Sequence, residues 1–162
     1  MSTRDARPPR LRAEPKPGGG LRWIARLDPA DELAYRLAVG GLVPAIEATL
    51  GPGVMANRVL ARGSRSWTML EPWRPARRTF RRALARLAAG HDMVAMTDVQ
   101  DCFGSIGPLA VGRSLRGLPR KDVAGILRLL DRFETGGVRG LPIGPDPSAI
   151  LANAVQIGRA HV

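Results

Sequence analysis

The sequence predicts a mixed fold of the α/β (α+β) class. Two segments, 73–89 and 120–133, repeat apolar residues at the spacing of a helix. Between them, residues 93–97 (MVAMT) form a compact apolar run that is typical of a buried strand. A chain of 162 residues that is 44% hydrophobic is long enough for about one domain with its own core.

The two ends of the chain are expected to lie outside the folded region. Prolines and consecutive glycines interrupt residues 1–20, so we predict a flexible basic arm there, with order beginning at Leu21. Residues 156–162 (QIGRAHV) can be encoded by a string that resembles the start of a common sequencing-library adapter. We interpret them as an adapter-derived tail, with a native tail as the alternative, and leave them out of the fold prediction.

The first helix is expected to begin after Asp28. An aspartate followed by Pro29 has the form of a helix start, because the carboxylate caps the helix and proline is suited to its first position. We expect a break or joint at Gly40 and Gly41, and an end at residues 51–53 (GPG).

The later elements follow from the same signals. We expect short strands within 54–69, helices at 73–89, near 109–115 and at 120–133, a buried strand at 93–97, and the opening of a helix at 148–155. The tryptophans Trp23, Trp67 and Trp73 are expected in the core, and base stacking is the alternative for any that is exposed.

The charge suggests a polyanionic partner. The net charge is +11, and all but two of the 25 basic residues are arginines, whose fork of donors suits phosphate. A GC-rich genome, which raises Arg, Ala, Gly and Pro together, is the alternative explanation. The single cysteine and two histidines exclude a disulfide framework and a Cys/His zinc site. With no membrane-length apolar run and no signal peptide pattern, we predict a cytoplasmic protein without a membrane partner.

The most informative segment is 97–106 (TDVQDCFGSI). Asp98 ends the predicted strand, Asp101 follows in a turn, and the aromatic Phe103 comes next. Carboxylate and carbonyl oxygens suit a hard divalent cation, and backbone N–H groups in a turn can hold phosphates. Asp98 as a turn-former or helix cap, and Phe103 as a simple core residue, are the alternatives. The segment resembles motif A of reverse transcriptases.

A second segment, 140–154 (GLPIGPDPSAILANA), resembles motif B of the same family. Motif B often has glutamine at the position of Ile143, so this chain departs from the pattern there. The stretch from Asp28 to Val59 also resembles the amino-terminal part of bacterial reverse transcriptases of the retron, group II intron and phage-defence types. The resemblance covers roughly residues 21–155. It implies a fingers-like helical region at 21–90, and a partial palm at 91–155 with helices on an antiparallel sheet.

The resemblance also implies site residues and a cofactor. Asp98 would be a ligand of two Mg²⁺ ions (Mn²⁺ being a substitute), with the carbonyl oxygen of Val99 helping one of them. The backbone N–H groups of Asp101 and Cys102 would hold an incoming deoxynucleoside triphosphate. Phe103 would be a steric gate against the ribose 2′-hydroxyl.

Several further residues are candidates for contacts with nucleotide or nucleic acid. Arg62 and Arg65 would reach the triphosphate. The template and primer would be bound by Pro142, Gly144, Ser148, Arg74, Arg77 and Arg78. For the arginine face of the helix at 73–89, a solvated face and a membrane-surface helix are the alternatives to phosphate contact. For Ser148, a helix cap is the alternative.

The function that the resemblance implies for the intact protein is RNA-directed DNA synthesis from dNTPs, with an RNA template and a DNA product or primer. The family's third signature, aromatic-x-Asp-Asp, is not in these 162 residues, so we expect them alone to be inactive. A non-catalytic, arginine-rich nucleic-acid-binding module is the alternative. An RNA-dependent RNA polymerase is disfavoured by the bulky Phe103. The sequence leaves open the oligomeric state and the biological role.

Overall fold

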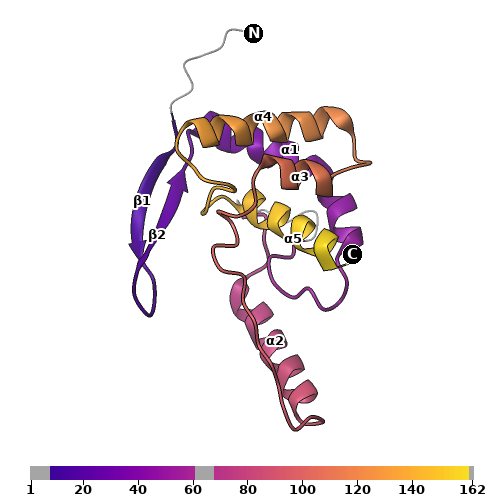
Figure 1. Cartoon of the computed structure of the whole chain (residues 1–162). Helices are drawn as coiled ribbons and strands as arrows, with labels where there is room; N and C mark the ends of the chain where they lie inside the picture. Colours follow the sequence, from indigo (N-terminus) through magenta and orange to yellow (C-terminus); the bar gives the residue numbers. More distant parts are fainter. Residues whose placement is uncertain (1–7, 61–67, 161–162) are drawn as a thin grey trace.

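The computed structural model describes residues 8–60 and 68–160, with side chains through Gln156. Within these residues the elements are β1 (Arg10–Pro15), β2 (Leu21–Arg26), α1 (Pro29–Thr49), α2 (Trp73–Ala88), α3 (Pro108–Ser114), α4 (Arg120–Thr135) and α5 (Asp146–Ala160). The mixed α+β class is therefore confirmed. Four helices form the body, the hairpin lies at its side, and α2 extends away from it (Figure 1).

The amino-terminal hairpin corrects the prediction of an arm without regular structure. β1 pairs antiparallel with β2, from Arg10 opposite Arg26 to Pro15 opposite Leu21. The consecutive glycines 18–20 have positive φ and form the turn, and Pro15 stands at the end of its strand. Proline at the end of an edge strand and glycine in a turn are compatible with a hairpin, so these residues shape the element rather than prevent it.

The core is built on one face of α1. The Asp28 side chain caps this helix by accepting a hydrogen bond from the Ala30 N–H over 3.1 Å, which confirms the predicted start. Tyr35 and Val39 are fully buried, and the helix packs against α4 and α5. The predicted break in the middle of the helix is wrong, because α1 is continuous through Gly40, where packing on two other helices outweighs the poor helix propensity of glycine.

Helices α3, α4 and α5 complete the core. α4 buries Ile126, Leu130 and Phe133 toward α1, and Phe133 meets the Tyr35 ring edge-on at 5.6 Å between ring centroids. α5 is almost wholly buried from its start to Val155, as expected for a central helix. The predicted helices at 109–115, 120–133 and 148–155 are thus confirmed, with α5 beginning two residues before the predicted opening.

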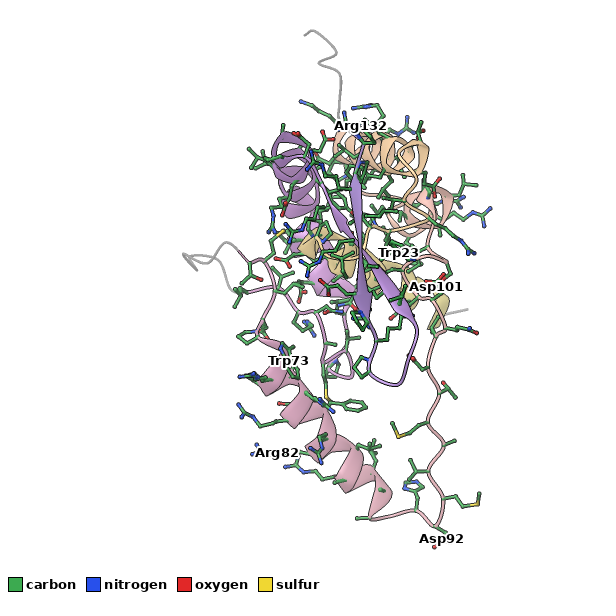
Figure 2. All side chains as sticks on the ribbon, turned by 90° about the vertical axis from the view of Figure 1, so that its left-hand side faces the viewer. Trp23, Trp73, Arg82, Asp92, Asp101 and Arg132 are labelled. Carbon is green, nitrogen blue, oxygen red and sulfur yellow. The ribbon has the colours of Figure 1, made fainter. Side chains whose placement is uncertain are left out.

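Helix α2 stands apart from this core. It packs against none of the other described helices or strands, and it buries none of its residues. At its far end the chain turns near Asp92 and returns to the body as an extended run (Figure 2). Trp23 and Trp73 are 54% and 63% exposed, so the prediction of core positions is wrong for both. Trp67 lies outside the described residues.

The predicted buried strand at 93–97 is also wrong. These residues are extended but exposed, Met93 by 88% and Met96 by 71%. Within the described part of the chain, the sheet consists of β1 and β2 alone, and no strand lies beside this run. A strand needs a neighbour to satisfy its backbone N–H and C=O groups, so the apolar pattern by itself does not produce one. Of the short strands expected within 54–69, the described residues show an isolated antiparallel bridge from Val59 to Leu70, and residues 61–67 lie outside the described part of the chain.

Candidate functional site

The structure brings together the two segments that the sequence singled out. The turn at 101–105 lies against the loop at 140–144, and the Leu141 N–H donates a hydrogen bond to the Phe103 carbonyl oxygen over 3.0 Å. Gly140 has φ +65°, and a Cβ added there would lie 2.5 Å from the same oxygen. Only glycine allows this approach of one backbone to the other, which explains why a glycine opens the second segment.

The turn itself has a specific backbone shape. Asp101 adopts a left-handed conformation with φ +47°, which aspartate tolerates better than most residues. Its carbonyl oxygen accepts a hydrogen bond from the Ser105 N–H over 2.9 Å, and its carboxylate lies where a Cβ of Gly104 would stand. Half-buried Phe103 packs on the hydrophobic core, as does Cys102 beside it. The turn is therefore anchored by one aromatic ring while Asp101 remains exposed (Figure 2).

Helix α5 contacts this turn from the other side. The Gln156 side-chain amide donates to the Cys102 sulfur over 2.8 Å. The turn is consequently held by Leu141 of the second segment and by Gln156, which follows that segment on α5 and is the first residue of the stretch interpreted as an adapter-derived tail. No residue pattern predicts the contact of Gln156 with Cys102, because a glutamine in a helix does not indicate which distant residue its side chain meets.

The predicted metal ligands lie on the exposed extended run. Asp98 is exposed, and Val99 is 53% exposed. Within the described residues, no three His, Cys, Asp or Glu side chains are grouped closely enough to hold a metal ion. One carboxylate is too few for a pair of Mg²⁺ ions, which are usually shared by several oxygen ligands. The described residues therefore do not by themselves fit the two-metal site that the resemblance implies.

The loop of the second segment is packed against the amino-terminal hairpin. The Ala25 N–H of β2 donates to the Ile143 carbonyl oxygen over 2.7 Å. A Cβ on Gly144 would lie 3.0 Å from the Ile24 side chain. Pro142 is buried, whereas Gly144 is exposed. The predicted template contact is thus accessible at Gly144 and covered at Pro142 in this structure.

Ser148 lies in the core rather than on a surface. Its hydroxyl is 3.2 Å from the Tyr35 hydroxyl, and both residues are fully buried. Burial raises the pKa of the Tyr35 phenol well above its usual range, and the hydrogen bond to Ser148 opposes this shift in part. The Ser148 side chain ties α5 to α1 here, and the proposed nucleic-acid contact for it stays a prediction.

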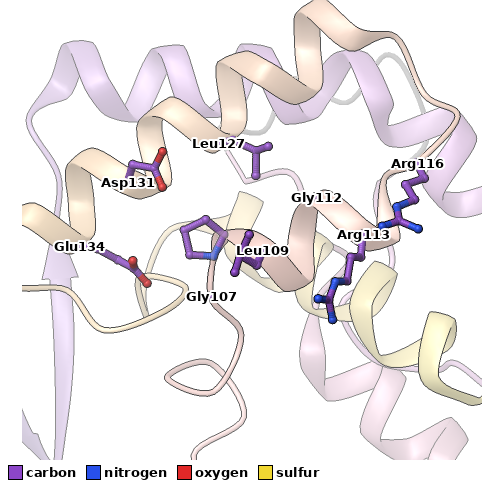
Figure 3. Close-up of a pocket in the computed structure, with 9 residues that line it drawn as sticks. Gly107, Leu109, Gly112, Arg113, Arg116, Leu127, Asp131 and Glu134 are labelled. Carbon is purple, nitrogen blue, oxygen red and sulfur yellow. The ribbon is translucent and has the colours of Figure 1, made fainter.

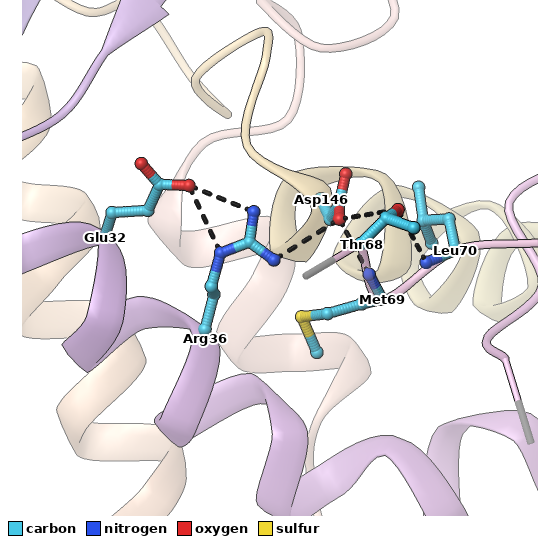
Figure 4. Close-up of polar contacts among 6 residues, drawn as sticks. All are labelled: Glu32, Arg36, Thr68, Met69, Leu70 and Asp146. Atoms are coloured by element: carbon cyan, nitrogen blue, oxygen red, sulfur yellow. Dashed lines mark hydrogen bonds and ion pairs between the residues drawn. The ribbon is translucent and has the colours of Figure 1, made fainter. Parts of the chain in front are cut away.

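Asp146, at the start of α5, organises a polar cluster that the sequence did not reveal (Figure 4). Its Oδ2 atom accepts hydrogen bonds from the Met69 N–H over 2.8 Å and from the Thr68 hydroxyl over 3.1 Å. It also pairs with Arg36 at 3.3 Å, and Arg36 in turn pairs with Glu32 at 3.0 Å. One carboxylate thereby joins α1, α5 and the segment that precedes α2. No local pattern marks it, because its partners are distant in sequence.

The predicted arginine contacts divide into two groups. On α2, Arg74, Arg77 and Arg78 are exposed, as are Arg81, Arg82 and Arg86 further along the helix. Arg62 and Arg65 lie outside the described residues. The exposed arginines give α2, the helix that projects from the body, a high positive charge, and Arg82 lies midway along it (Figure 2).

A groove between α3 and α4 has a different composition. Its volume is about 760 Å³, and Leu109 and Leu127 form apolar lining. Arg113 and Arg116 lie toward one end, and Asp131 and Glu134 toward the other (Figure 3). The predicted site residues are not part of it.

Comparison with known proteins adds no relative. No protein-family model, curated protein or solved structure matches this chain. Among the described helices, none combines the length and the apolar character that crossing a bilayer requires.

Proposed function

We propose that this chain is the amino-terminal part of an RNA-directed DNA polymerase, with deoxynucleoside triphosphates as substrates and an RNA template. One observation carries the proposal. The two segments that resemble motifs A and B lie far apart in the sequence, yet Leu141 of the second donates a hydrogen bond to Phe103 of the first. A nucleotide site built from both segments requires that they be neighbours.

In this proposal Phe103 sets the choice of sugar. It is the aromatic residue of the turn, and its carbonyl oxygen accepts the Leu141 N–H and lies close against Gly140. A fixed backbone holds the ring at a constant position, which a steric gate needs in order to reject one hydroxyl group. The exposed arginines of α2 supply phosphate contacts for the nucleic acid.

The test begins with the source DNA, read onward from the codon for Val155, and with the protein that this reading frame encodes. We expect an apolar hairpin with the aromatic-x-Asp-Asp signature and primer extension by that protein with dNTPs on RNA. Asp98→Ala should lower extension more than roughly 100-fold, because it removes a proposed metal ligand. Asp92→Ala is the matched control, since Asp92 is an exposed carboxylate at the start of the same run. Extension that survives Asp98→Ala contradicts the proposal.

The role of Phe103 has its own readout. Phe103→Ala should raise the ratio of kcat/KM for ribonucleotides to that for deoxynucleotides, because the ring no longer occupies the space of the 2′-hydroxyl. This ratio is independent of the fraction of protein that folds, so a purely structural role would leave it unchanged.

A non-catalytic nucleic-acid-binding module is the second candidate, favoured by the projecting arginine helix. In that case Asp98→Ala would change synthesis and salt-dependent binding equally, or neither. Loss of synthesis with retained binding separates the polymerase from the module.

A further inference from the structure

A second cavity lies where α2 leaves the body. Its volume is about 510 Å³, within the ~300–1,000 Å³ range of small-molecule sites. Three parts of the chain form it: the loop at 53–57, the first turns of α2, and Asn153 and Gln156 of α5. Gln156 belongs to the stretch interpreted above as an adapter-derived tail, so the inference is carried by the lining residues up to Asn153.

Two aromatic side chains line this cavity although neither is buried. Trp73 is 63% exposed and Phe80 is 46% exposed. Trp73 is at the end of α2 nearest the body (Figure 2). Exposed aromatic rings on the wall of a cavity offer flat apolar faces to a ligand, and every nucleobase has a π-face that stacks on such a ring.

Positive charge lies over the Trp73 ring. The guanidinium carbons of Arg74 and Arg77 lie 5.6 and 6.0 Å from the centroid of the Trp73 ring. Arg77 also lines the cavity. A guanidinium beside an aromatic ring suits a ligand that has a flat base and a phosphate on the same unit. The Glu71 carboxylate and the Asn153 amide oxygen add acceptors that the amino groups of a base edge can meet.

The wall opposite α2 is held by specific hydrogen bonds. The Asn153 side-chain amide donates to the carbonyl oxygens of Ala56 and Asn57, over 3.0 and 3.3 Å. Arg58 donates to the Val54 carbonyl oxygen over 3.1 Å and to the Glu47 carboxylate over 2.8 Å. Because this loop is fixed by α1 and α5, this wall of the cavity is in place before any ligand enters it.

We infer that this cavity binds an unstacked base of single-stranded nucleic acid, with the base against Trp73 and Phe80 and its phosphate at Arg77. The inference rests on the proposed function in taking nucleic acid as the substrate. It extends that proposal by naming where a single strand is held at the start of α2. Two exposed aromatic side chains, one of them with arginines over its ring, match such a ligand better than a lipid surface, because polar Asn153 closes the cavity on one side.

The experiment measures binding by the 162-residue chain. The probes are a fluorescent oligodeoxythymidylate of twelve nucleotides and an abasic oligomer with the same number of phosphates. The wild type should bind the first about tenfold more tightly, since stacking on an aromatic contributes ~1–3 kcal/mol per base. Trp73→Ala should remove most of this difference and leave binding of the abasic oligomer unchanged. Arg77→Gln should weaken binding of both oligomers.

Two control variants make the result specific. Trp23→Ala alters a tryptophan of similar exposure on β2, outside the cavity, and should leave both affinities unchanged. Leu87→Ala removes an exposed apolar side chain of α2 that does not line the cavity, and should likewise leave both affinities unchanged. Equal effects of Trp23→Ala and Trp73→Ala, or no preference for the oligomer with bases, would overturn the inference.

Anionic phosphatidylglycerol vesicles provide the remaining arm. Vesicle binding that Trp73→Ala and Leu87→Ala weaken alike, with oligonucleotide binding unaffected by either, assigns the apolar face of α2 to a lipid surface and overturns the inference. Failure of the proposed function is distinct from this. A base preference that depends on Trp73, in a protein whose synthesis does not depend on Asp98, supports the cavity and rejects the polymerase. Synthesis that depends on Asp98, without an effect of Trp73→Ala on base preference, supports the polymerase and rejects the cavity as a base-binding site.

Discussion

The carbonyl oxygen of Phe103 is the point at which two distant backbones meet. It accepts the Leu141 N–H over 3.0 Å, and the Cα of Gly140 lies close against it with no room for a side chain. Position 140 is therefore constrained both by its left-handed φ and by the neighbouring backbone, and these two constraints can be measured separately.

Gly140→Ala should be strongly destabilising. The new Cβ would lie 2.5 Å from the Phe103 oxygen and 2.8 Å from the Gly104 oxygen, so the hydrogen bond with Leu141 must break or shift. Gly137→Ala is the matched control, because Gly137 also has positive φ but open space around it. We expect a loss of roughly 1–2 kcal/mol of unfolding free energy for the control and at least about 3 kcal/mol for Gly140→Ala, measured in urea. Equal losses would show that φ alone matters.

The buried hydroxyl pair should behave as a unit. Tyr35→Phe leaves the Ser148 hydroxyl without its partner, and Ser148→Ala leaves the Tyr35 hydroxyl without its own. Each change should lower the unfolding free energy by about 1–3 kcal/mol, and the double variant should lose less than the sum. Additive losses in a double-mutant cycle would mean that the two hydroxyls do not interact.

The chain should lose stability in strong alkali because of its single tyrosine. Burial raises the pKa of Tyr35 in the folded state, so the unfolded chain loses the phenolic proton first. The stabilising contribution is fully present below the unfolded pKa of about 10 and declines as pH rises above it toward the folded pKa. Tyrosinate absorbance should therefore appear only with unfolding. Absorbance that appears while circular dichroism still reports native helix would contradict this prediction.

Asp146 should matter more than its partial exposure suggests. Asp146→Asn removes the charge that faces Arg36 and weakens the acceptor for Thr68 and Met69. We expect a loss of about 1–3 kcal/mol in urea unfolding, since hydrogen bonds to charged groups are stronger than neutral ones. Asp92→Asn is the control, as Asp92 is exposed at the far end of α2. Similar losses for both variants would reject a special role for Asp146.

The arginines of α2 should account for part of the salt dependence of nucleic-acid binding. Replacing Arg74, Arg77 and Arg78 with glutamine should lower the slope of log K against log salt by roughly two for a single strand, because each phosphate contact contributes about 0.7. The control replaces Arg120, Arg128 and Arg139, which are exposed elsewhere, and changes the net charge equally. Equal slopes for the two triple variants would show that only overall charge matters.

Sequence patterns predicted the helices well because each one carries local signals. Asp28 and Pro29 start α1, and the apolar spacing of α4 matches the residues that it buries, such as Ile126 and Leu130. The same reasoning failed for residues 93–97, because a strand depends on a partner that an apolar pattern does not specify. It also failed for the hairpin, because proline and glycine interrupt a strand in its interior but are suited to a strand end and a turn, where Pro15 and the three glycines lie.

For the candidate site, the sequence predicted which two segments are involved but not the side-chain contacts that hold them. The two segments were identified from their residue patterns, and they are neighbours in the structure. Their side-chain contacts were not predictable, because Gln156 with Cys102 and Asp146 with Met69 join positions far apart in the sequence. The cavity beside Trp73 was missed for the same reason, as its walls come from three separate parts of the chain.

The packing of α1 on α5 determines when the core can form during synthesis of the protein. Tyr35 and Val39 leave the ribosome early, but α5, whose Ser148 meets Tyr35, is synthesised last among the described elements. The apolar face of α1 must therefore wait, partly uncovered, while most of the chain is translated. Contacts between such distant segments slow folding, and a nascent chain with an uncovered apolar helix is a substrate for chaperones. Synthesis of this protein should accordingly depend on chaperone supply more than its small size suggests.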